Sequence, residues 1–480
     1  MGLAATGICS MIGASIYVVP FMIQRNVPGI GPYVLPAFLF AAIPATLAAF
    51  AYIILASAMP RAGGSYIYAS RALSPYLGFI ASFSQWFGLS IAIGVVSYVI
   101  VPFLRDTAIT LQWTKIALIL DQSAVRVSLS LFFLWAFVLI NIRGIKLYEL
   151  TVVPLMFIMF GLGAIVIVAG LMFNHQDFAE AVMAKDGMSL PSTIVEFNWR
   201  TFLAGSALLF SSFIGFDSIA QAGGEAKNPS HTLPRAIGIA IIVVSSFYIL
   251  FTLAVYHTVP WSFVAQQSLL KDVTAPGLLS YVLPSGWAVP IVLGAALALM
   301  NDLPAMILSV SRLMFSWAED GIFPKRISAI HTKYQTPHIA IVLSGVMATV
   351  GILGSHFAGD FFLGIDIMVT SMLVNFLLMC LSVLMLPKTN PTLADEIKIF
   401  KSRRLQQILA LAGMLWLAGF LIIHIMKDLS TEVAAWYFHS TPVWLLVMTF
   451  GSILFYVFWL RLKKSGVDTK KLFHTLPPES

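Results

Sequence analysis

Near its N-terminus the chain reads GICSMIGASIYVVP over residues 7–20. This run is apolar enough to enter a lipid bilayer, yet Gly7, Gly13, Ala14 and Ser15 are small, and glycine and serine hold a helix together poorly. We therefore expect a membrane helix that is broken near its middle. A break frees backbone N–H and C=O groups, which persist inside a membrane only where protein or a water-filled cavity satisfies them.

Two simpler interpretations compete with a broken helix. Small residues at these spacings also let two membrane helices approach closely, without any break. A cleaved signal peptide is the second alternative. No Lys or Arg precedes the run, and no small-x-small cleavage site followed by a polar chain is evident, which argues against a signal peptide.

The composition excludes the soluble classes of protein. Hydrophobic residues make up 59% of the chain, charged residues only 10%, and the mean hydropathy is +0.90, so we expect an integral membrane protein. The net charge of +7 comes from short basic clusters between apolar runs, where basic residues set topology, and nucleic-acid binding is not implied. Cys9 and Cys380 both fall within apolar runs, so no disulfide framework is indicated.

Apolar runs of about 20 residues, the length that crosses a bilayer, occur about twelve times, and no stretch between them is long enough for a soluble domain. Residues 1–480 are therefore expected to form a single membrane domain. The predicted spans are 3–24, 33–58, 75–103, 126–142, 148–173, 200–222, 235–258, 288–316, 339–356, 361–386, 404–426 and 434–460.

The basic residues predict an orientation. With the N-terminus in the cytoplasm, the loops on that side hold 20 of the 28 Lys and Arg residues, which leaves 8 for the opposite side. By the positive-inside rule, both termini face the cytoplasm.

A second interruption lies two hundred residues after the first. The sixth span reads LLFSSFIGFDSIA over residues 208–220, where Gly215 stands near two serines and Asp217. The first and sixth spans are thus both interrupted, five spans apart. This is the pattern of inverted repeats in secondary transporters, whose broken helices form a midplane binding site.

Three acidic residues fall inside predicted spans, where a carboxylate costs about 2.5–3.5 kcal/mol and needs a partner or a proton. Asp366 is interpreted as an interfacial residue, and Asp217 as either a functional group or a structural group that locks the break. Asp302 lies mid-span between Asn301 and Pro304, and proline bends a helix. We therefore favour Asp302 as a group that carries a proton or contacts a cation.

Motifs for catalysis or cofactor binding are absent from the sequence. The nine histidines are scattered, with no pair four residues apart on one helix. No nucleophile elbow, phosphate loop or metalloprotease motif appears. We expect no cofactor, no metal and no enzyme, although an intramembrane enzyme with an acid and a histidine at one depth is the rival class.

Several stretches resemble one family, the amino acid–polyamine–organocation transporters. IGASIY at 12–17 is similar to the family's G-(S/A)-G-I-F motif, and MPRAGGSY at 59–66 to its P-R-A-G-G-x-Y loop. FIGFD at 213–217, EAKNP at 225–229 and LPRAI at 233–237 resemble the family's sixth helix and the loop after it, and SR at 311–312 with EDGIFP at 319–324 resembles the end of its eighth helix.

The resemblance implies an all-α fold of the leucine-transporter type. Residues 1–173 would be the first five-helix repeat, 200–386 the second, inverted repeat, and 404–460 two accessory helices. The substrate carboxylate would meet backbone N–H groups at the first break, and the ammonium would meet carbonyl groups exposed at both breaks. The substrate-binding residues implied are Ile12, Gly13, Ala14, Ser15, Ile16, Tyr98, Phe210, Ser211, Phe213, Ile214, Gly215, Asp302 and Met306.

The sequence departs from the family pattern at several positions. Ser211 falls where some exchangers carry a gating tryptophan, so Phe210 or Phe213 would gate instead, and Met306 replaces an aromatic residue. Proton-coupled members carry a lysine in the fifth span, but none occurs between Lys146 and Lys185. One acid of the E-E-x-K-N-P loop is missing as well. The implied coupling and gating residues are Asp217, Asp302, Glu225 and Lys227.

The sequence thus predicts a secondary active transporter of amino acids or related amines in the plasma membrane, of the bacterial inner-membrane type. It would work by alternating access, either proton-coupled or as an exchanger. The alternatives are an amino-acid-binding membrane sensor and a transporter of polyamines or other organic cations. The expected partners are a small-molecule substrate and the lipid bilayer, and the oligomeric state is left open.

Overall fold

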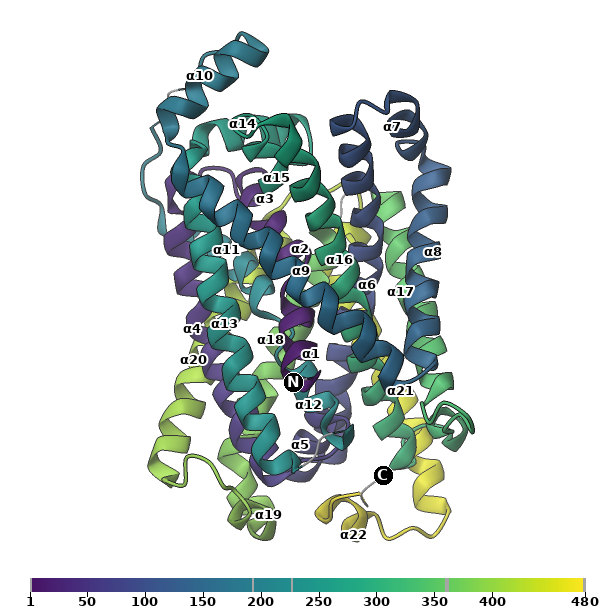
Figure 1. The fold of residues 1–480 in the computed structure, drawn as a ribbon. Coiled ribbons are helices and arrows are strands. Elements are labelled where there is room, and N and C mark those ends of the chain that lie inside the picture. The colour runs from purple at the N-terminus through teal and green to yellow at the C-terminus, as the bar shows by residue number, and fades with distance from the viewer. Residues whose placement is uncertain (1, 192–193, 226–227, 359–361, 478–480) are drawn as a thin grey trace.

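The computed structural model describes residues 2–191, 194–225, 228–358 and 362–477, and within these ranges all the regular secondary structure is helical (Figure 1). The longer helices are α4 (Val34–Ala58), α6 (Pro75–Thr110), α8 (Ser123–Ile142), α9 (Ile145–Met172), α13 (Pro229–Thr258), α16 (Ser285–Glu319), α17 (His338–Ala358), α18 (Phe362–Thr389), α20 (Arg403–Ser430) and α21 (Ser440–Lys464).

The shorter helices lie at the breaks and in the connections. The α-helices among them are α1 (Gly2–Met11), α2 (Ala14–Tyr17), α3 (Val19–Asn26), α5 (Gly64–Ala72), α7 (Thr114–Leu120), α10 (His175–Asp186), α11 (Trp199–Leu209), α12 (Ser218–Gln221), α14 (Trp261–Leu270), α15 (Ala275–Leu279), α19 (Pro391–Asp395) and α22 (Thr469–His474). The 3₁₀ helices are η1 (Gly31–Tyr33), η2 (Phe210–Phe213), η3 (Gly223–Glu225), η4 (Lys325–Ser328) and η5 (Trp436–Phe438).

Within the described ranges, 11 helical segments are long and apolar enough to cross a membrane, and the chain is a multi-pass membrane protein. The sequence predicts about twelve spans, and the predicted span that is not among these 11 segments is the first. Residues 3–24 form α1, α2 and α3 in place of one continuous helix, and α1 has only 10 residues. The prediction of a helix broken near its middle is confirmed there.

Helix α6 lies at the centre of the bundle and is almost wholly buried, whereas α20 and α21 are largely exposed at its edge. Helices α16, α17 and α18 all contact α6. Buried on most sides, α6 is apolar all round its circumference, as a helix in the interior of a bundle must be. The connecting helices α7, α10 and α14 lie at the opposite end of the molecule from α19 and α22 (Figure 1).

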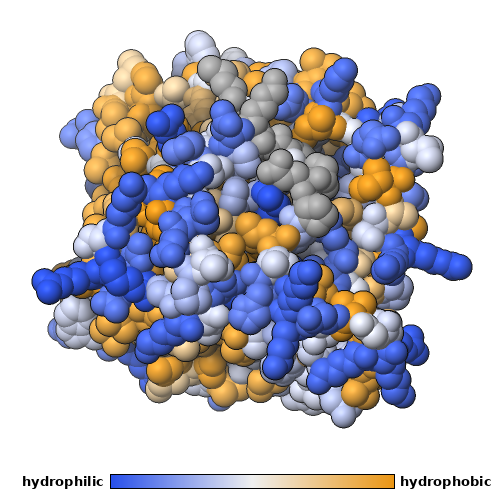
Figure 2. Space-filling model, turned by 90° about the horizontal axis from the view of Figure 1, so that it is seen from below, coloured by the Kyte–Doolittle hydropathy of each residue, from blue (hydrophilic) through white to orange (hydrophobic). Residues whose placement is uncertain are grey.

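Both chain ends lie in the lower half of the molecule in Figure 1. We call the face at that end, which Figure 2 shows from below, the terminal face. It carries many hydrophilic side chains. Just inside it, Arg71 of α5 and Asp320 at the end of α16 form a buried, two-pronged ion pair, with Nη2 3.0 Å from Oδ1. Thr475, just after α22, accepts from Nε of the same arginine.

Candidate functional site

The first break lies between α1 and α2, at Ile12 and Gly13. The N–H of Ile12 still donates to Ile8 O at 2.9 Å, so the helical pattern holds up to that residue. The carbonyl of Met11 accepts from the Tyr248 hydroxyl of α13. This contact satisfies a carbonyl that the break would otherwise leave in the membrane interior.

Gly13 lies directly against the carboxyl group of Asp302 on α16. A Cβ atom at Gly13 would meet Cγ of Asp302 at 2.8 Å, a separation that real Cβ atoms do not show. The break is therefore held against Asp302 by a close approach that only glycine permits.

The second break begins where α11 gives way to η2 and ends where α12 starts at Ser218. Gly215 adopts a φ of +133°, a conformation that strongly favours glycine. A Cβ there would meet Met11 N at 2.8 Å, and the Ser10 and Ser218 hydroxyl oxygens are 2.9 Å apart. The two breaks therefore touch each other.

A small cavity of about 50 Å³ lies beside the two breaks. Its polar lining residues are Ser10, Ser211 and Asp302. The remaining lining is apolar and comes from the segment after the first break, from the residue that follows η2, and from α6, α16 and α18. These apolar residues are Val18, Val19, Leu89, Ala92, Val95, Val96, Val99, Ile214, Met306, Ile365 and Met368.

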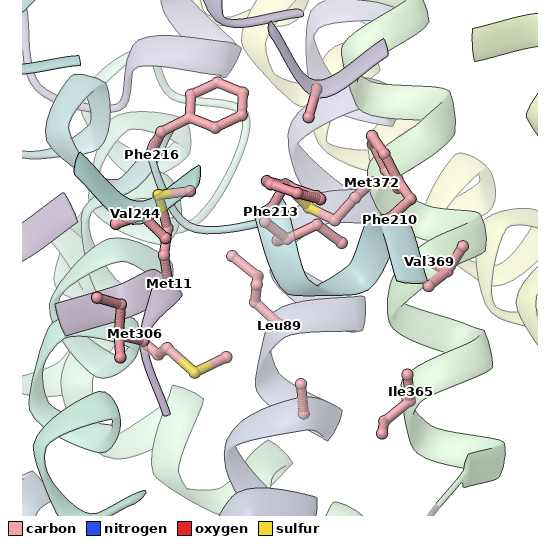
Figure 3. Close-up of a cluster of buried hydrophobic side chains, with 14 of the residues drawn as sticks. Met11, Leu89, Phe210, Phe213, Phe216, Val244, Met306, Ile365, Val369 and Met372 are labelled. Carbon is pink, nitrogen blue, oxygen red and sulfur yellow. The ribbon is translucent and has the colours of Figure 1, made fainter. Parts of the chain in front are cut away.

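Figure 3 shows the side chains of Met306, Leu89 and Ile365, which come from three different helices of this wall. Phe210 and Phe213 lie nearby on η2, but they pack against other aromatic rings. The ring of Phe213 is 5.2 Å from that of Phe38, and the ring of Phe210 is 6.1 Å from that of Phe376.

Asp302 is 4% exposed, and its Oδ1 has no hydrogen-bond partner among the described residues. Ser211 Oγ is unpartnered in the same sense. A buried polar atom without a partner costs about 1–3 kcal/mol, and more when it is charged. Two such atoms on one cavity wall indicate a ligand that forms hydrogen bonds with them.

Asn301 does not pair with its neighbour Asp302. Its side-chain nitrogen lies 3.0 Å from Cys9 Sγ of α1. With the amide reversed, the same side chain bonds Val152 O and Met156 N of α9, each at 3.3 Å. In either orientation Asn301 ties α16 to a neighbouring helix, and Asp302 is left facing the cavity.

Asp217 belongs to a different environment from Asp302. Its carboxylate accepts from the Gln85 side chain and, at 3.1 Å, from the N–H of Gly215. From Gln85 a buried polar chain continues through Gln221, Ser65, Tyr52 and Asn375, which joins α6, α12, α5, α4 and α18. Asp217 therefore braces the second break from within the protein and does not line the cavity.

The structure brings together Ser211, Ile214, Asp302 and Met306 of the predicted binding residues, with Gly13 behind Asp302. Tyr98 is not part of the lining. Its hydroxyl is 3.2 Å from His356 Nδ1, and the Arg126 guanidinium lies 3.8 Å from its ring.

The remaining predicted residues lie at or near the breaks, or outside what is described. Ile12, Ile16 and Gly215 are buried at the breaks without lining the cavity. Ala14 and Ser15 contribute the backbone that starts α2, and their side chains are outside the described part. Glu225 ends η3 with its side chain likewise outside that part, and Lys227 lies outside the described residues altogether.

The resemblance implied that the third span, α6, contributes to side-chain selectivity, but the sequence interpretation missed the residues that α6 supplies to the wall. Leu89, Ala92, Val96 and Val99 recur every three or four residues and so share one face of the helix. That spacing is visible in the sequence. Because apolar residues lie on every side of α6, however, and its few polar residues do not mark the cavity face, the sequence does not distinguish that face from those that pack against other helices.

Two helix breaks that touch beside a cavity, within a bundle of membrane-spanning helices, are typical of secondary transporters. The family comparison agrees. The profile of the amino acid permease family matches residues 1–453, and the chain belongs to that family, which consists of transporters and not of enzymes. The resemblance noted from the sequence motifs is thereby confirmed, and family membership implies the leucine-transporter-type fold.

The relatives of this chain are named as transporters of several kinds of substrate. The chain is 26% identical to the vacuolar cationic amino acid transporter 2 of Arabidopsis thaliana, over 72% of this chain and 53% of the relative. It is 27% identical to the branched-chain amino acid permease BcaP of Bacillus subtilis, over 82% of each chain. It is 24% identical to the low-affinity putrescine importer PlaP of Escherichia coli, over 71% and 69%. The chain thus spans about half the length of the plant relatives it matches.

Proposed function

We propose that this protein is a secondary active transporter of amino acids or related amines that works by alternating access. The observation that carries the proposal is the cavity beside two touching helix breaks, with the unpartnered Asp302 and Ser211 on its wall. Membership in the amino acid permease family and the names of its relatives support the same substrate class.

The proposed architecture is a five-plus-five inverted repeat. Residues 1–173 would form one repeat, 200–386 the other, and 404–460 two accessory helices. Each repeat begins with a broken segment, α1 to α3 in the first and α11 to α12 in the second. The exposed positions of α20 and α21 at the edge of the bundle agree with an accessory role.

At the proposed site, the backbone after the Gly13 break would receive the substrate carboxylate. Backbone carbonyls at the two breaks, near Ile12 and between Phe210 and Phe213, would receive the ammonium. Asp217 and the loop at Glu225 and Lys227 would act in coupling or gating. Because the fifth span has no lysine beyond Lys146 in its first turn, we expect coupling either through a carboxyl group or by exchange of one substrate for another.

The proposed location is a plasma membrane of the bacterial inner-membrane type, with both termini in the cytoplasm. The excess of Lys and Arg in the loops on one side supports this orientation. The position of both chain ends toward one end of the molecule agrees with it (Figure 1).

Uptake into proteoliposomes tests the proposal. Purified protein should accumulate or exchange at least one radiolabelled amino acid or amine, with and without a proton gradient, above the level in protein-free liposomes. Dependence on the gradient would indicate proton coupling, and dependence on internal substrate would indicate exchange. Saturable binding with no flux under any of these conditions would contradict transport and favour a sensor.

A further inference from the structure

We infer that Asp302 pairs with the α-ammonium group of a neutral amino acid that has an aliphatic side chain, and that the site rejects substrates with a second positive charge. The inference rests on the proposed transport function and deepens it. It differs from the substrates named for the cationic amino acid and putrescine transporters among the relatives.

The first step is the position of Asp302. Its carboxyl group lies against Gly13, at the first break, and not at the far end of the cavity. The polar lining residues Ser10 and Ser211 lie near the end of α1 and in η2, respectively, beside the same breaks. The polar groups of the site therefore lie together, where the α-ammonium and α-carboxylate groups that all amino acids share would bind.

The second step is the chemistry of the remaining wall. Among the described lining residues, Asp302 is the one acid, and none is basic. Val95, Val96, Val99, Ile365 and Met368 are entirely apolar. An ammonium group at the end of a lysine or putrescine chain would lose its water against this wall without a carboxylate to meet it, and such desolvation is costly.

The third step concerns the other acids inside the bundle, which already have partners. Asp366 forms an ion pair with Lys427 at 3.3 Å, and Asp217 accepts from Gln85 and Gly215. Neither lines the cavity. Asp302 thus supplies a single carboxyl group, which can pair with one ammonium group.

A ligand series on the wild-type protein is the first experiment. Uptake of radiolabelled leucine into proteoliposomes is measured in the presence of each unlabelled competitor. The competitors are leucine, 2-hydroxy-4-methylpentanoate, which lacks the ammonium group, lysine and putrescine. We expect leucine to compete at least about tenfold better than the hydroxy acid, because a hydrogen bond to a charged group is lost. Lysine and putrescine should compete least.

Chain length adds a second expectation for the same assay. Each methylene buried against the apolar wall should improve affinity by about fourfold, so that 2-aminobutyrate binds better than alanine and norvaline better than 2-aminobutyrate. A series with no dependence on chain length would contradict the placement of the side chain on this wall.

Two pairs of variants make the test specific. Asp302→Asn should weaken leucine binding about tenfold or more, whereas Asp366→Asn, an acid outside the cavity, should not change it. Val96→Asp should admit lysine as a competitor, whereas the uncharged Val96→Asn should not. Size-exclusion profiles in detergent establish that each variant is folded, and the wild-type series stands even if a variant is not.

The outcomes separate the two proposals. If lysine or putrescine is transported and leucine does not compete, or if Asp302→Asn binds leucine as well as the wild type does, the inference is wrong while transport stands. If no amino acid or amine is transported or exchanged at all, the proposed function itself is contradicted.

Discussion

A Gly13→Ala variant is expected to lose transport by up to about a hundredfold, because the added methyl group would collide with the Asp302 carboxyl group. Relief of the collision requires α1 or α16 to move, and either movement displaces the break from the cavity wall. Initial rates of uptake in proteoliposomes measure the loss. The matched control is Gly161→Ala in α9, where a Cβ would meet nothing within 4 Å.

A second-site variant separates the collision from other causes. Gly13→Ala with Asp302→Gly removes every side-chain atom of residue 302 that the added methyl group would meet. The double variant should fold as well as the wild type by size-exclusion chromatography, yet it should not recover transport, because the carboxyl group is gone. Uptake by Gly13→Ala at the wild-type rate would show that the close approach of α1 to Asp302 is not needed.

The largest effect on stability is expected at the buried ion pair near the terminal face. Arg71→Met leaves the Asp320 carboxylate buried without its cation, and the free energy of unfolding should fall by about 3–5 kcal/mol. The double variant Arg71→Met, Asp320→Asn should recover much of that loss, since no uncompensated charge remains. Denaturant titration in micelles, followed by tryptophan fluorescence, measures both.

An exposed pair provides the control for that experiment. Arg25 Nη1 and Asp272 Oδ1 are 3.1 Å apart, but the two side chains are 31% and 40% exposed. Exposed pairs contribute about 0–1 kcal/mol, so Arg25→Met should change stability little. Equal losses for Arg71→Met and Arg25→Met would mean that the Arg71 pair is not buried in the folded protein.

The apolar patterning predicted the fold well, because in a membrane each span must satisfy its own backbone and so leaves a long apolar run. The two breaks were predicted from small residues beside polar ones, and both occur where they were expected. The predicted boundaries differ from the helices chiefly at their ends. Helix α6, for example, continues beyond residue 103 to Thr110.

The candidate site was predictable only where a residue type is out of place in a membrane or in the family pattern. Asp302 is an acid inside an apolar span and was identified for that reason, whereas Ser211 was identified because it falls where some family exchangers carry a gating tryptophan. Leu89 and Val96 are apolar residues among apolar residues, and their place on the cavity wall depends on how α6 is rotated in the bundle. Nor does the sequence distinguish Asp217 from Asp302, since only the fold brings Gln85 to one and leaves the other facing the cavity.

Alternating access requires the cavity wall at Ser211 to open to each side of the membrane in turn. Ser211→Cys can be labelled by a membrane-impermeant thiol reagent, and the unmodified protein is a suitable control because Cys9 and Cys380 are both buried. We expect labelling from either side of the membrane, slowed from both sides by a bound substrate such as leucine. Labelling from one side alone, unchanged by any amino acid or amine, would contradict alternating access through this cavity.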